Sequence, residues 1–484
     1  MKGKFINTSI TNLLNQTQKQ LKKATSQRIQ IGVTGLSGSG KSTFVTSLIT
    51  QLLTANTVAK LPFVELINEN RWLGAKLSNH ENGEYIRFPY EESIHNLQQL
   101  DSWPNPTTRE SRIVLELTYI AKSSIWSKFW PERTLEIELI DYPGEWLSDI
   151  PLLDLDYFAW SAEMSTNLKP FRDFDEAKVF NKKISSLHKM TQSSKDESFS
   201  ENNIKYLQVV EAYKSWLRAI HENTDQYVIL QPGRFLSPGH LENTPLLNFF
   251  PWDLNQFPLN EAASIIPLLK NRYRTYQKKV ITPFLTDFFN GCSRQIILVD
   301  LVNAVNGGKE EVTKLQQILK NVFKIHDYGT NNWLRRLINP NIEKILVATS
   351  KADLLPPDQH RKMQLLLSSI LTNEIDTLKR QGCCYNALAI SSIRATENRL
   401  ISENGHDIQA VCGRLEQVAD DQENWVTVIP ADFPESMKQL ESKAVHGLQN
   451  VKFAPPENWR LGKEALPHIR MDQVIEFLVG DLMR

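Results

Sequence analysis

The distribution of apolar residues along the chain predicts a sheet that is covered by helices on both faces. Residues 28–34 form a short apolar strand pattern ahead of a glycine-rich segment, and residues 41–54 place apolar side chains at helical spacing. Near-continuous apolar runs at residues 295–300, 344–349 and 385–391 are typical of central parallel strands with helices on each side. Together these patterns predict an α/β fold.

Two further stretches alternate between apolar and polar positions, as strands with one buried face do. Residues 112–121 and 134–140 are joined by a short connection, so they are predicted to pair as an antiparallel hairpin. Residues 55–110 have no clear periodicity and are expected to be irregular. The amphipathic patterns of residues 8–26 and 471–482 each predict a helix.

Segments of different character interrupt this core. Residues 151–290 are polar with helical periodicity and predict a mainly helical insertion, in which Lys189 to Asn203 is rich in serine and charge and is expected to be a mobile loop. Residues 397–465 contain Gly, Pro and short β-type runs and predict a β-rich insertion. The predicted core then comprises residues 1–150, 291–396 and a C-terminal helix within 466–484.

Composition limits the class of partner. The 484 residues include 55 Lys and Arg and 55 Asp and Glu, so a formal net charge of zero argues against nucleic acid. The four cysteines lack zinc-ligand spacing and indicate free thiols in a reducing compartment. No apolar stretch has the length of a spanning helix, and the N-terminus lacks the apolar core of a signal peptide. We expect a cytoplasmic protein, with any attachment to the inner membrane provided by an unidentified protein partner.

Residues 35–42 read GLSGSGKS, a complete phosphate-binding loop between a predicted strand and a predicted helix. Glycines let the backbone approach a phosphate, and the successive N–H groups at the start of the helix favour its negative charge. Lys41 is expected to contact the β- and γ-phosphate oxygens, and the Ser42 hydroxyl is expected to bind Mg²⁺. The expected phosphate-binding residues are Ser37, Gly38, Ser39, Gly40, Lys41, Ser42 and Thr43.

Residues 141–144 read DYPG directly after a predicted strand and fit the DxxG motif of Ras-like GTPases. In that motif the aspartate binds the Mg²⁺ shell through water, and the glycine N–H meets the γ-phosphate. Asp141 and Gly144 are therefore expected to sense the γ-phosphate.

Base recognition is predicted at two later strand ends. Guanine presents its N1–H and N2–H₂ donors together, and Asp353 in the segment SKAD (residues 350–353) offers a carboxylate that can accept both. This segment resembles the [NT]KxD motif, although Ser350 in place of Asn or Thr puts its hydrogen bond to the phosphate loop in doubt. An adenine would leave Asp353 without matching donors, so guanine is favoured. The expected base-binding residues are Lys351, Ala352, Asp353, Ser392, Ile393 and, over one face of the base, Trp103.

A loop ahead of the first hairpin strand lies where a γ-phosphate-sensing switch belongs. Its threonines, Thr107 and Thr108, both have the hydroxyl needed to complete the Mg²⁺ shell, and spacing does not choose between them. In the same loop, Trp103 could stack on the base or could be a packing anchor. Arg109 could be a charge-stabilising arginine supplied in cis, or it could be solvated or salt-bridged. The predicted metal-binding set is Ser42, Thr107 or Thr108, and Asp141 through water.

Glu145 follows the DxxG glycine, where many Ras-like proteins have a water-orienting Gln. A carboxylate could orient the attacking water, but it is repelled by a γ-phosphate, so slow intrinsic hydrolysis is expected. Asp300, at the end of an apolar run, is interpreted as structural. Arg234 could contact either the nucleotide or the interface with the insertion.

Six segments spread over the chain carry a resemblance to a known family: residues 32–42 (GVTGLSGSGKS), 140–146 (IDYPGEW), 231–236 (QPGRFL), 299–304 (VDLVNA), 350–353 (SKAD) and 467–472 (PHIRMD). With them the chain resembles the YcjX-like family of bacterial P-loop proteins, relatives of the Ras-like GTPases. The resemblance implies a GTPase-like core that hydrolyses a nucleotide, and expression alongside a bacterial envelope-stress response. From the apolar runs and the motifs we expect this core to be a mostly parallel sheet with helices on both faces, and the nucleotide to be GTP or GDP bound with Mg²⁺.

The leading functional hypothesis is a GTP-hydrolysing molecular switch whose two insertions respond to the bound nucleotide. Two alternatives remain open at this point. One is an ATPase or kinase-type P-loop enzyme acting on a small substrate, and the other is a non-hydrolysing scaffold that binds nucleotide for stability.

Overall fold

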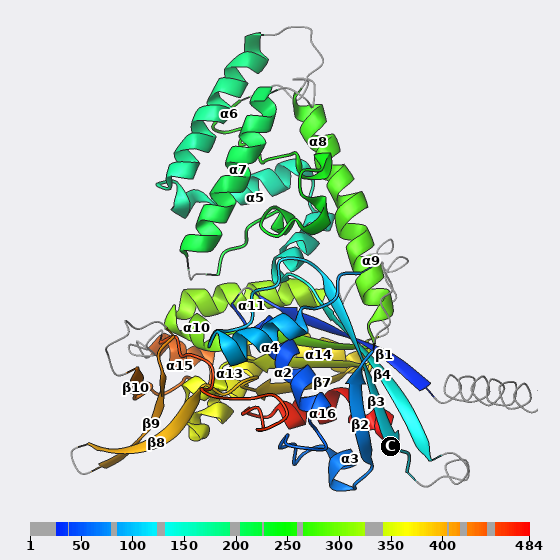
Figure 1. Ribbon diagram of the computed structural model, residues 1–484. Coiled ribbons are helices and arrows are strands. Elements are labelled where there is room, and N and C mark those ends of the chain that lie inside the picture. Colours follow the sequence, from blue (N-terminus) through cyan, green and yellow to red (C-terminus); the bar gives the residue numbers. More distant parts are fainter. Residues whose placement is uncertain are drawn as a thin grey trace, which may run out of the picture.

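A helical region is stacked on an α/β layer that contains the main sheet (Figure 1). The computed structural model describes residues 26–36, 38–78, 85–122, 131–193, 204–224, 227–258, 265–324, 342–403, 406–416, 424–442 and 451–484. The helix predicted at residues 8–26 and most of the loop predicted at 189–203 lie outside these residues. Lys189 to Ser193 are the last residues of the helix Asp175–Ser193, so the prediction of a loop is wrong for them.

The main sheet has seven strands in the order β2-β3-β4-β1-β5-β6-β7. Its central strand β1 is parallel to β4 and β5, and β6 and β7 continue the parallel array. Strand β3 is antiparallel to both β4 and the edge strand β2, which confirms the predicted hairpin. The strands are β1 (Ser26–Gly35), β2 (Trp72–Leu77), β3 (Ser111–Ile120), β4 (Glu132–Asp141), β5 (Arg294–Val299), β6 (Lys344–Thr349) and β7 (Cys384–Ala389).

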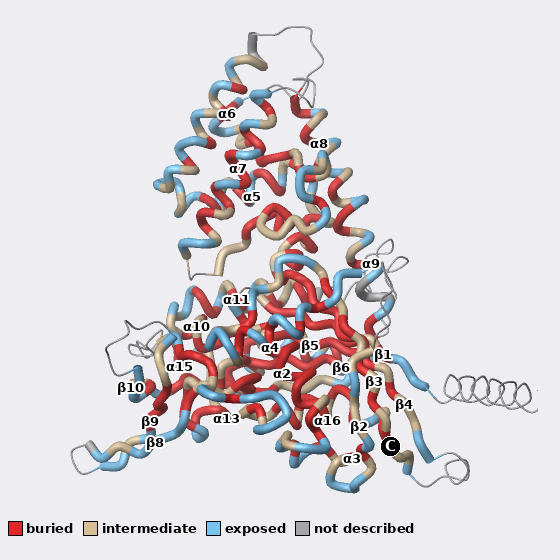
Figure 2. The backbone as a smooth tube through the Cα atoms, viewed as in Figure 1, coloured by how far each residue is buried: buried red, intermediate tan, exposed pale blue. Residues whose placement is uncertain are grey.

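Helices cover both faces of this sheet, and strand β5 near its centre is buried along its whole length (Figure 2). Alternation along β5 shows the reason: Ile296 and Leu298 belong to the core on one face, whereas Ile297 and Val299 belong to the core on the other. The predicted α/β class is confirmed. One face packs against α2 (Lys41–Leu53), α4 (Tyr90–Gln99) and α16 (Met471–Val479), and the other against α10 (Leu301–Asn306), α11 (Lys309–Lys324), α13 (His360–Ile370) and α14 (Thr372–Arg380).

Residues 55–110 are more regular than predicted. They contain the short helix α3 (Glu65–Asn68), the edge strand β2 and helix α4. The periodicity of α4 is hidden in the sequence because polar Ser93 and Asn96 occupy buried positions beside Ile94 and Leu97. Tertiary contacts, rather than an apolar pattern, therefore specify this helix.

The helical region shares one continuous core with the sheet face that it covers. Stacked aromatic rings fill its centre, such as Trp160 against Tyr273 with ring centroids 5.2 Å apart. Helix α9 runs from this region down to the start of β5 (Figure 1). The helices are α5 (Tyr157–Asn167), α6 (Asp175–Ser193), α7 (Ile204–Asn223), α8 (Ile265–Tyr276) and α9 (Thr282–Gly291), with a π-helical turn at Gln277–Ile281 between the last two.

A second, smaller sheet forms an arm on the α/β layer (Figure 1). Its three antiparallel strands are β8 (Thr396–Glu403), β9 (His406–Arg414) and β10 (Trp425–Val428), and helix α15 (Met437–Ser442) follows. Among the described residues, no helix combines the length and apolar character needed to cross a membrane.

Candidate functional site

The phosphate loop joins the end of β1 to the start of α2. Gly38 and Gly40 have φ of 77° and 78°, the left-handed region that glycine adopts without steric cost. Gly40 also caps α2, so the N–H groups of the loop and of the first helical turn converge as in an anion-binding nest. Ser39 is buried, Thr43 is half-buried in the first turn, and Ser37 lies outside the described residues.

Four predicted site residues from three segments meet beside this loop. The Lys41 ammonium lies 2.9 Å from Oδ1 of Asp141, and both side chains are buried. Thr107 donates its hydroxyl proton to Oδ2 of Asp141 at 2.6 Å, and its Oγ1 lies 3.1 Å from Oγ of Ser42. The phosphate loop, the switch loop and the DxxG segment are thereby connected through side chains.

These oxygens fit a Mg²⁺ ion. Magnesium prefers hard oxygen ligands in an octahedron with bonds of about 2.1 Å, in which neighbouring oxygens are about 3 Å apart. The 3.1 Å separation of the Ser42 and Thr107 hydroxyl oxygens matches that spacing. Asp141 borders the pair and could hold a water of the shell, and this set leaves the remaining positions to phosphate oxygens and water.

The structure distinguishes the two switch threonines. Thr107 is half-buried within the cluster, whereas Thr108 and Arg109 are exposed. Arg109 lies beside Gly239 of the helical region instead of in the cluster. Thr107 is therefore the better candidate for a metal ligand, which spacing alone could not decide.

The DxxG glycine packs directly on the phosphate loop. A Cβ atom at Gly144 would lie 1.9 Å from the carbonyl oxygen of Gly35, a distance that no side chain tolerates. Only glycine thus lets the segment at Gly144 contact the phosphate loop directly, so a displacement of one would displace the other.

The segment after Gly144 is fastened to the helical region. Trp146 donates its indole N–H to the carbonyl of Ser237 at 2.8 Å, and the Arg234 guanidinium stacks 3.1 Å from the centre of the Trp146 ring. Burial lowers the pKa of Arg234 to about 10, against the opposing influence of Tyr276 and Asp149. Arg234 therefore contacts the segment after Gly144 at its interface with the helical region, which matches one of the two roles left open by the sequence.

Asp149 lies beneath the same interface, in the 3₁₀ segment Gly144–Asp154. Its carboxylate accepts the Gly233 N–H at 2.7 Å and the Tyr276 hydroxyl at 2.5 Å. Burial raises the pKa of Asp149 to about 6, because these hydrogen bonds and Arg234 offset only part of the cost of ionisation.

The proposed base-binding aspartate is buried at the end of β6. Oδ2 of Asp353 accepts the N–H of Ala395 at 2.9 Å. Burial raises the pKa of Asp353, and the hydrogen bonds from Ala395 and Ser391 oppose the rise. Further N–H donors, such as those of guanine, would stabilise this carboxylate.

Lys351 and Ala352 complete the segment around Asp353. Lys351 adopts a left-handed backbone conformation, and its ammonium lies 2.5 Å from Oδ2 of Asp300. Asp300 also caps α10 by accepting the N–H of Asn303 at 3.0 Å, in keeping with its predicted structural role. The buried Ala352 donates its N–H to the carbonyl of Ile390 at 2.9 Å. This bond ties the segment to the strand end that carries the other base-binding candidates.

The loop that carries Ser392 and Ile393 is tied to the phosphate-binding helix. Ser47 of α2 donates its hydroxyl proton to the carbonyl of Ser392. No partner for the N–H groups of Ser392 and Ile393 occurs within the described part of the chain. The Ser350 hydroxyl donates to the carbonyl of Val299 at 3.2 Å, a partner outside the phosphate loop.

Trp103 makes a packing contact with the second insertion. Its indole N–H donates to the carbonyl of Phe453 at 2.9 Å, and its ring packs against the core on the sheet face that α2 covers. Nearby, both carboxylate oxygens of Asp101 accept bonds from Arg414 of β9. Stacking of Trp103 on a base stays a prediction, while its contact with the insertion is direct.

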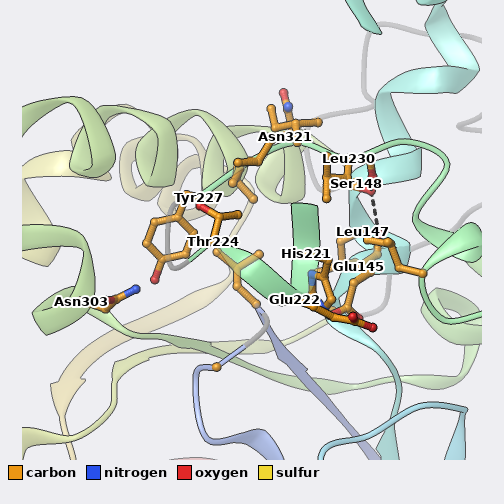
Figure 3. Close-up of a pocket in the computed structure, with 17 residues that line it drawn as sticks. Glu145, Leu147, Ser148, His221, Glu222, Thr224, Tyr227, Leu230, Asn303 and Asn321 are labelled. Carbon is orange, nitrogen blue, oxygen red and sulfur yellow. Dashed lines mark hydrogen bonds and ion pairs between the residues drawn. The ribbon is translucent and has the colours of Figure 1, made fainter. Parts of the chain in front are cut away.

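A cavity of about 280 Å³ opens between the phosphate loop, the segment after Gly144 and the helical region. Figure 3 shows Glu145, His221 and Glu222 together at one end of it, with Tyr227 and Asn303 towards the other. Nε2 of His221 lies 3.9 Å from Oε1 of Glu145. Sequence analysis missed His221, because a histidine near the end of a polar helix carries no motif.

Comparisons with known proteins assign the chain to a family. The YcjX-like family, DUF463, matches residues 29–483. A protein of Escherichia coli named Ras-like GTPase YcjX is 31% identical over 482 residues, which cover 98% of this chain and 99% of that protein. A protein of the same name from Shewanella oneidensis is 29% identical over 497 residues, with 99% of each chain covered.

Proposed function

The chain belongs to the YcjX-like family, and from this premise we propose that it binds guanine nucleotide with Mg²⁺ and hydrolyses GTP to GDP as a molecular switch. Its relatives of similar length are named Ras-like GTPases, and its main sheet has the mostly parallel order expected of that fold. One observation carries the proposal: Lys41, Ser42, Thr107 and Asp141 meet beside the phosphate loop with the spacing of a Mg²⁺–phosphate site.

Phosphoryl transfer depends mainly on positioning and on neutralising charge. Lys41 is placed to offset charge on the β- and γ-phosphate oxygens once a phosphate competes with Asp141 for its ammonium. When bound, Mg²⁺ would be held by Ser42 and Thr107 and would neutralise the same oxygens. Gly144, in contact with the phosphate loop, places its segment next to the γ-phosphate.

The proposed switch role rests on two contacts: the segment after Gly144 and the loop ahead of Thr107 each contact a different insertion. The segment after Gly144 is held by Arg234 and Ser237 of the helical insertion. The loop ahead of Thr107 is held at Asp101 and Trp103 by the β-rich insertion. Each insertion is thus fastened to a different γ-phosphate-sensing segment, so a change of nucleotide would alter both contacts.

Guanine preference rests on Asp353, a buried carboxylate at the end of β6. Replacement of Asp353 by Asn exchanges an acceptor for a donor, so the variant should lose GDP affinity by tenfold or more and gain xanthosine diphosphate affinity, at about 1–3 kcal/mol per unmatched group. Titrating both proteins with GDP, XDP and ADP measures this directly. Equal affinity of the wild-type protein for ADP and GDP would instead support the ATPase or kinase-type alternative.

The scaffold alternative makes a different prediction. A nucleotide kept only for stability would raise the melting temperature with GDP and GTP alike, with no turnover of GTP. Turnover of GTP that depends on Mg²⁺ would exclude the scaffold alternative.

The family resemblance adds the expectation of a role in a bacterial envelope-stress response through a protein partner, in the cytoplasm or at the inner membrane.

A further inference from the structure

A cavity borders the phosphate loop on the side where Glu145 lies. Leu36 and Gly38 of the loop line it together with Gly144 and Glu145. The opposite wall comes from the helical insertion, through residues 221, 222, 224 and 227–230, and from α11. The insertion therefore covers this side of the candidate catalytic site.

His221 is the residue of the helical insertion that lies at ion-pair distance from Glu145. It occupies the last turn of α7, where the negative end of the helix dipole favours a positive or proton-donating group. Its Nε2 lies at ion-pair distance, 3.9 Å, from Oε1 of Glu145. The Glu145 side chain is only 13% exposed, whereas that of His221 is 35% exposed, so the histidine retains freedom to approach.

Glu145 by itself is a poor group for holding a water at a γ-phosphate. Its carboxylate is repelled by the phosphate and can rotate to present either oxygen. An N–H group directed at one oxygen fixes that rotation and offsets part of the charge, as the third member of a catalytic triad does for its histidine. His221 would supply such an N–H once the 3.9 Å between its Nε2 and Oε1 of Glu145 shortens to hydrogen-bond distance, and the two side chains lie together at one end of the cavity (Figure 3).

We propose that His221 is a positioning residue for Glu145, supplied in cis by the helical insertion. The inference rests on the proposed GTP hydrolysis and extends it by giving the insertion a part in the reaction. The water oxygen forms a bond to the γ-phosphorus, and the bond to the β–γ bridging oxygen breaks with its electron pair left on GDP. Glu145 accepts a proton from the water, and that proton passes on to the released phosphate.

Single-turnover hydrolysis of GTP and affinity for GTPγS, measured on the full chain with Mg²⁺, test this assignment. H221A should hydrolyse GTP at least about tenfold more slowly, with GTPγS affinity within about twofold of wild type. H221Q keeps an N–H donor and should recover a substantial part of the rate. H406A, at the exposed start of β9, is the matched control and should match wild type.

A double variant separates positioning from a structural role. E145A/H221A should be no slower than E145A alone, because the two residues act as one unit. The inference is overturned if H221A hydrolyses GTP as fast as wild type, if its rate and affinity fall together, or if the two substitutions are additive. A wild-type protein without GTP turnover would instead overturn the proposed function itself.

Discussion

At the residue scale, contact geometry explains why glycine follows the DYP residues at position 144. The Gly35 carbonyl oxygen occupies the place of a Cβ atom, and the neighbouring contacts are also backbone, which cannot turn away. A side chain here must push the switch segment off the phosphate loop. Gly144 is therefore the last residue of the DxxG motif and also the point at which this segment contacts the phosphate loop.

Replacing Gly144 by Ala should reduce the ratio of GTPγS affinity to GDP affinity by about fivefold or more, since overpacking of this kind costs about 1–3 kcal/mol. The strain falls mainly on the GTP-bound state, in which the segment must meet the γ-phosphate. Titrations with both nucleotides give the ratio. Gly462→Ala, at a left-handed position with open space around it, is the control for backbone strain alone. An unchanged ratio in G144A would show that this contact is not part of nucleotide sensing.

The sequence placed candidate site residues at strand ends, because motifs record local backbone requirements. It predicted the phosphate loop, Asp141, Gly144 and Asp353, each at the end of a strand that the structure contains. It could not choose Thr107 over Thr108, because that choice depends on which hydroxyl faces Asp141 across the fold. His221 and the pairing of Lys351 with Asp300 were missed for the same reason.

At the element scale, the 3₁₀ segment Gly144–Asp154 is the joint between the site and the helical insertion. Asp149 anchors it with a buried carboxylate whose pKa is raised to about 6 by burial. A carboxyl group with a raised pKa in the folded state stabilises the fold below its ordinary pKa near 4. That stability is lost as the pH rises through 6.

Asp149→Asn should therefore gain stability relative to wild type as the pH rises from 4 to 7, by about 2 kcal/mol in the free energy of unfolding. Urea unfolding of both proteins at the two pH values measures the difference. Asp407→Asn, at an exposed position on β9, is the control, because surface substitutions usually change stability by less than about 0.5 kcal/mol. A constant gap between D149N and wild type would contradict a raised pKa at Asp149.

Prediction of elements succeeded where burial follows a simple period and failed where it does not. The buried strands β5 and β6, of which only Lys344 at the start of β6 is partly exposed, were predicted from apolar runs. Helix α4 and the edge strand β2 were not, because α4 buries polar residues and β2 is only partly covered. Such elements depend on contacts that form only in the folded chain.

At the scale of the whole molecule, the two insertions contact the surroundings of the candidate nucleotide site at separate points: the helical insertion at Trp146, and the β-rich insertion at Asp101 and Trp103. Exchange of GDP for GTPγS should alter amide hydrogen exchange in both α7 and β9 of the wild-type protein. Arg234→Met, which removes the cation over Trp146, should abolish the response in α7 and leave that in β9. Arg414→Met, which removes the partner of Asp101, should do the reverse. The same loss in both variants would indicate general destabilisation instead of two separate connections.

The central claim is hydrolysis of GTP at the site formed by the phosphate loop, Thr107 and Asp141. Its most direct test is a chromatographic assay of the nucleotide products formed from GTP and from ATP, with Mg²⁺, by the wild-type protein and by Lys41→Ala. We predict GDP from GTP in the wild type, little ADP from ATP, and no product above background from K41A. Equal turnover of ATP, or no difference between wild type and K41A, would contradict the account.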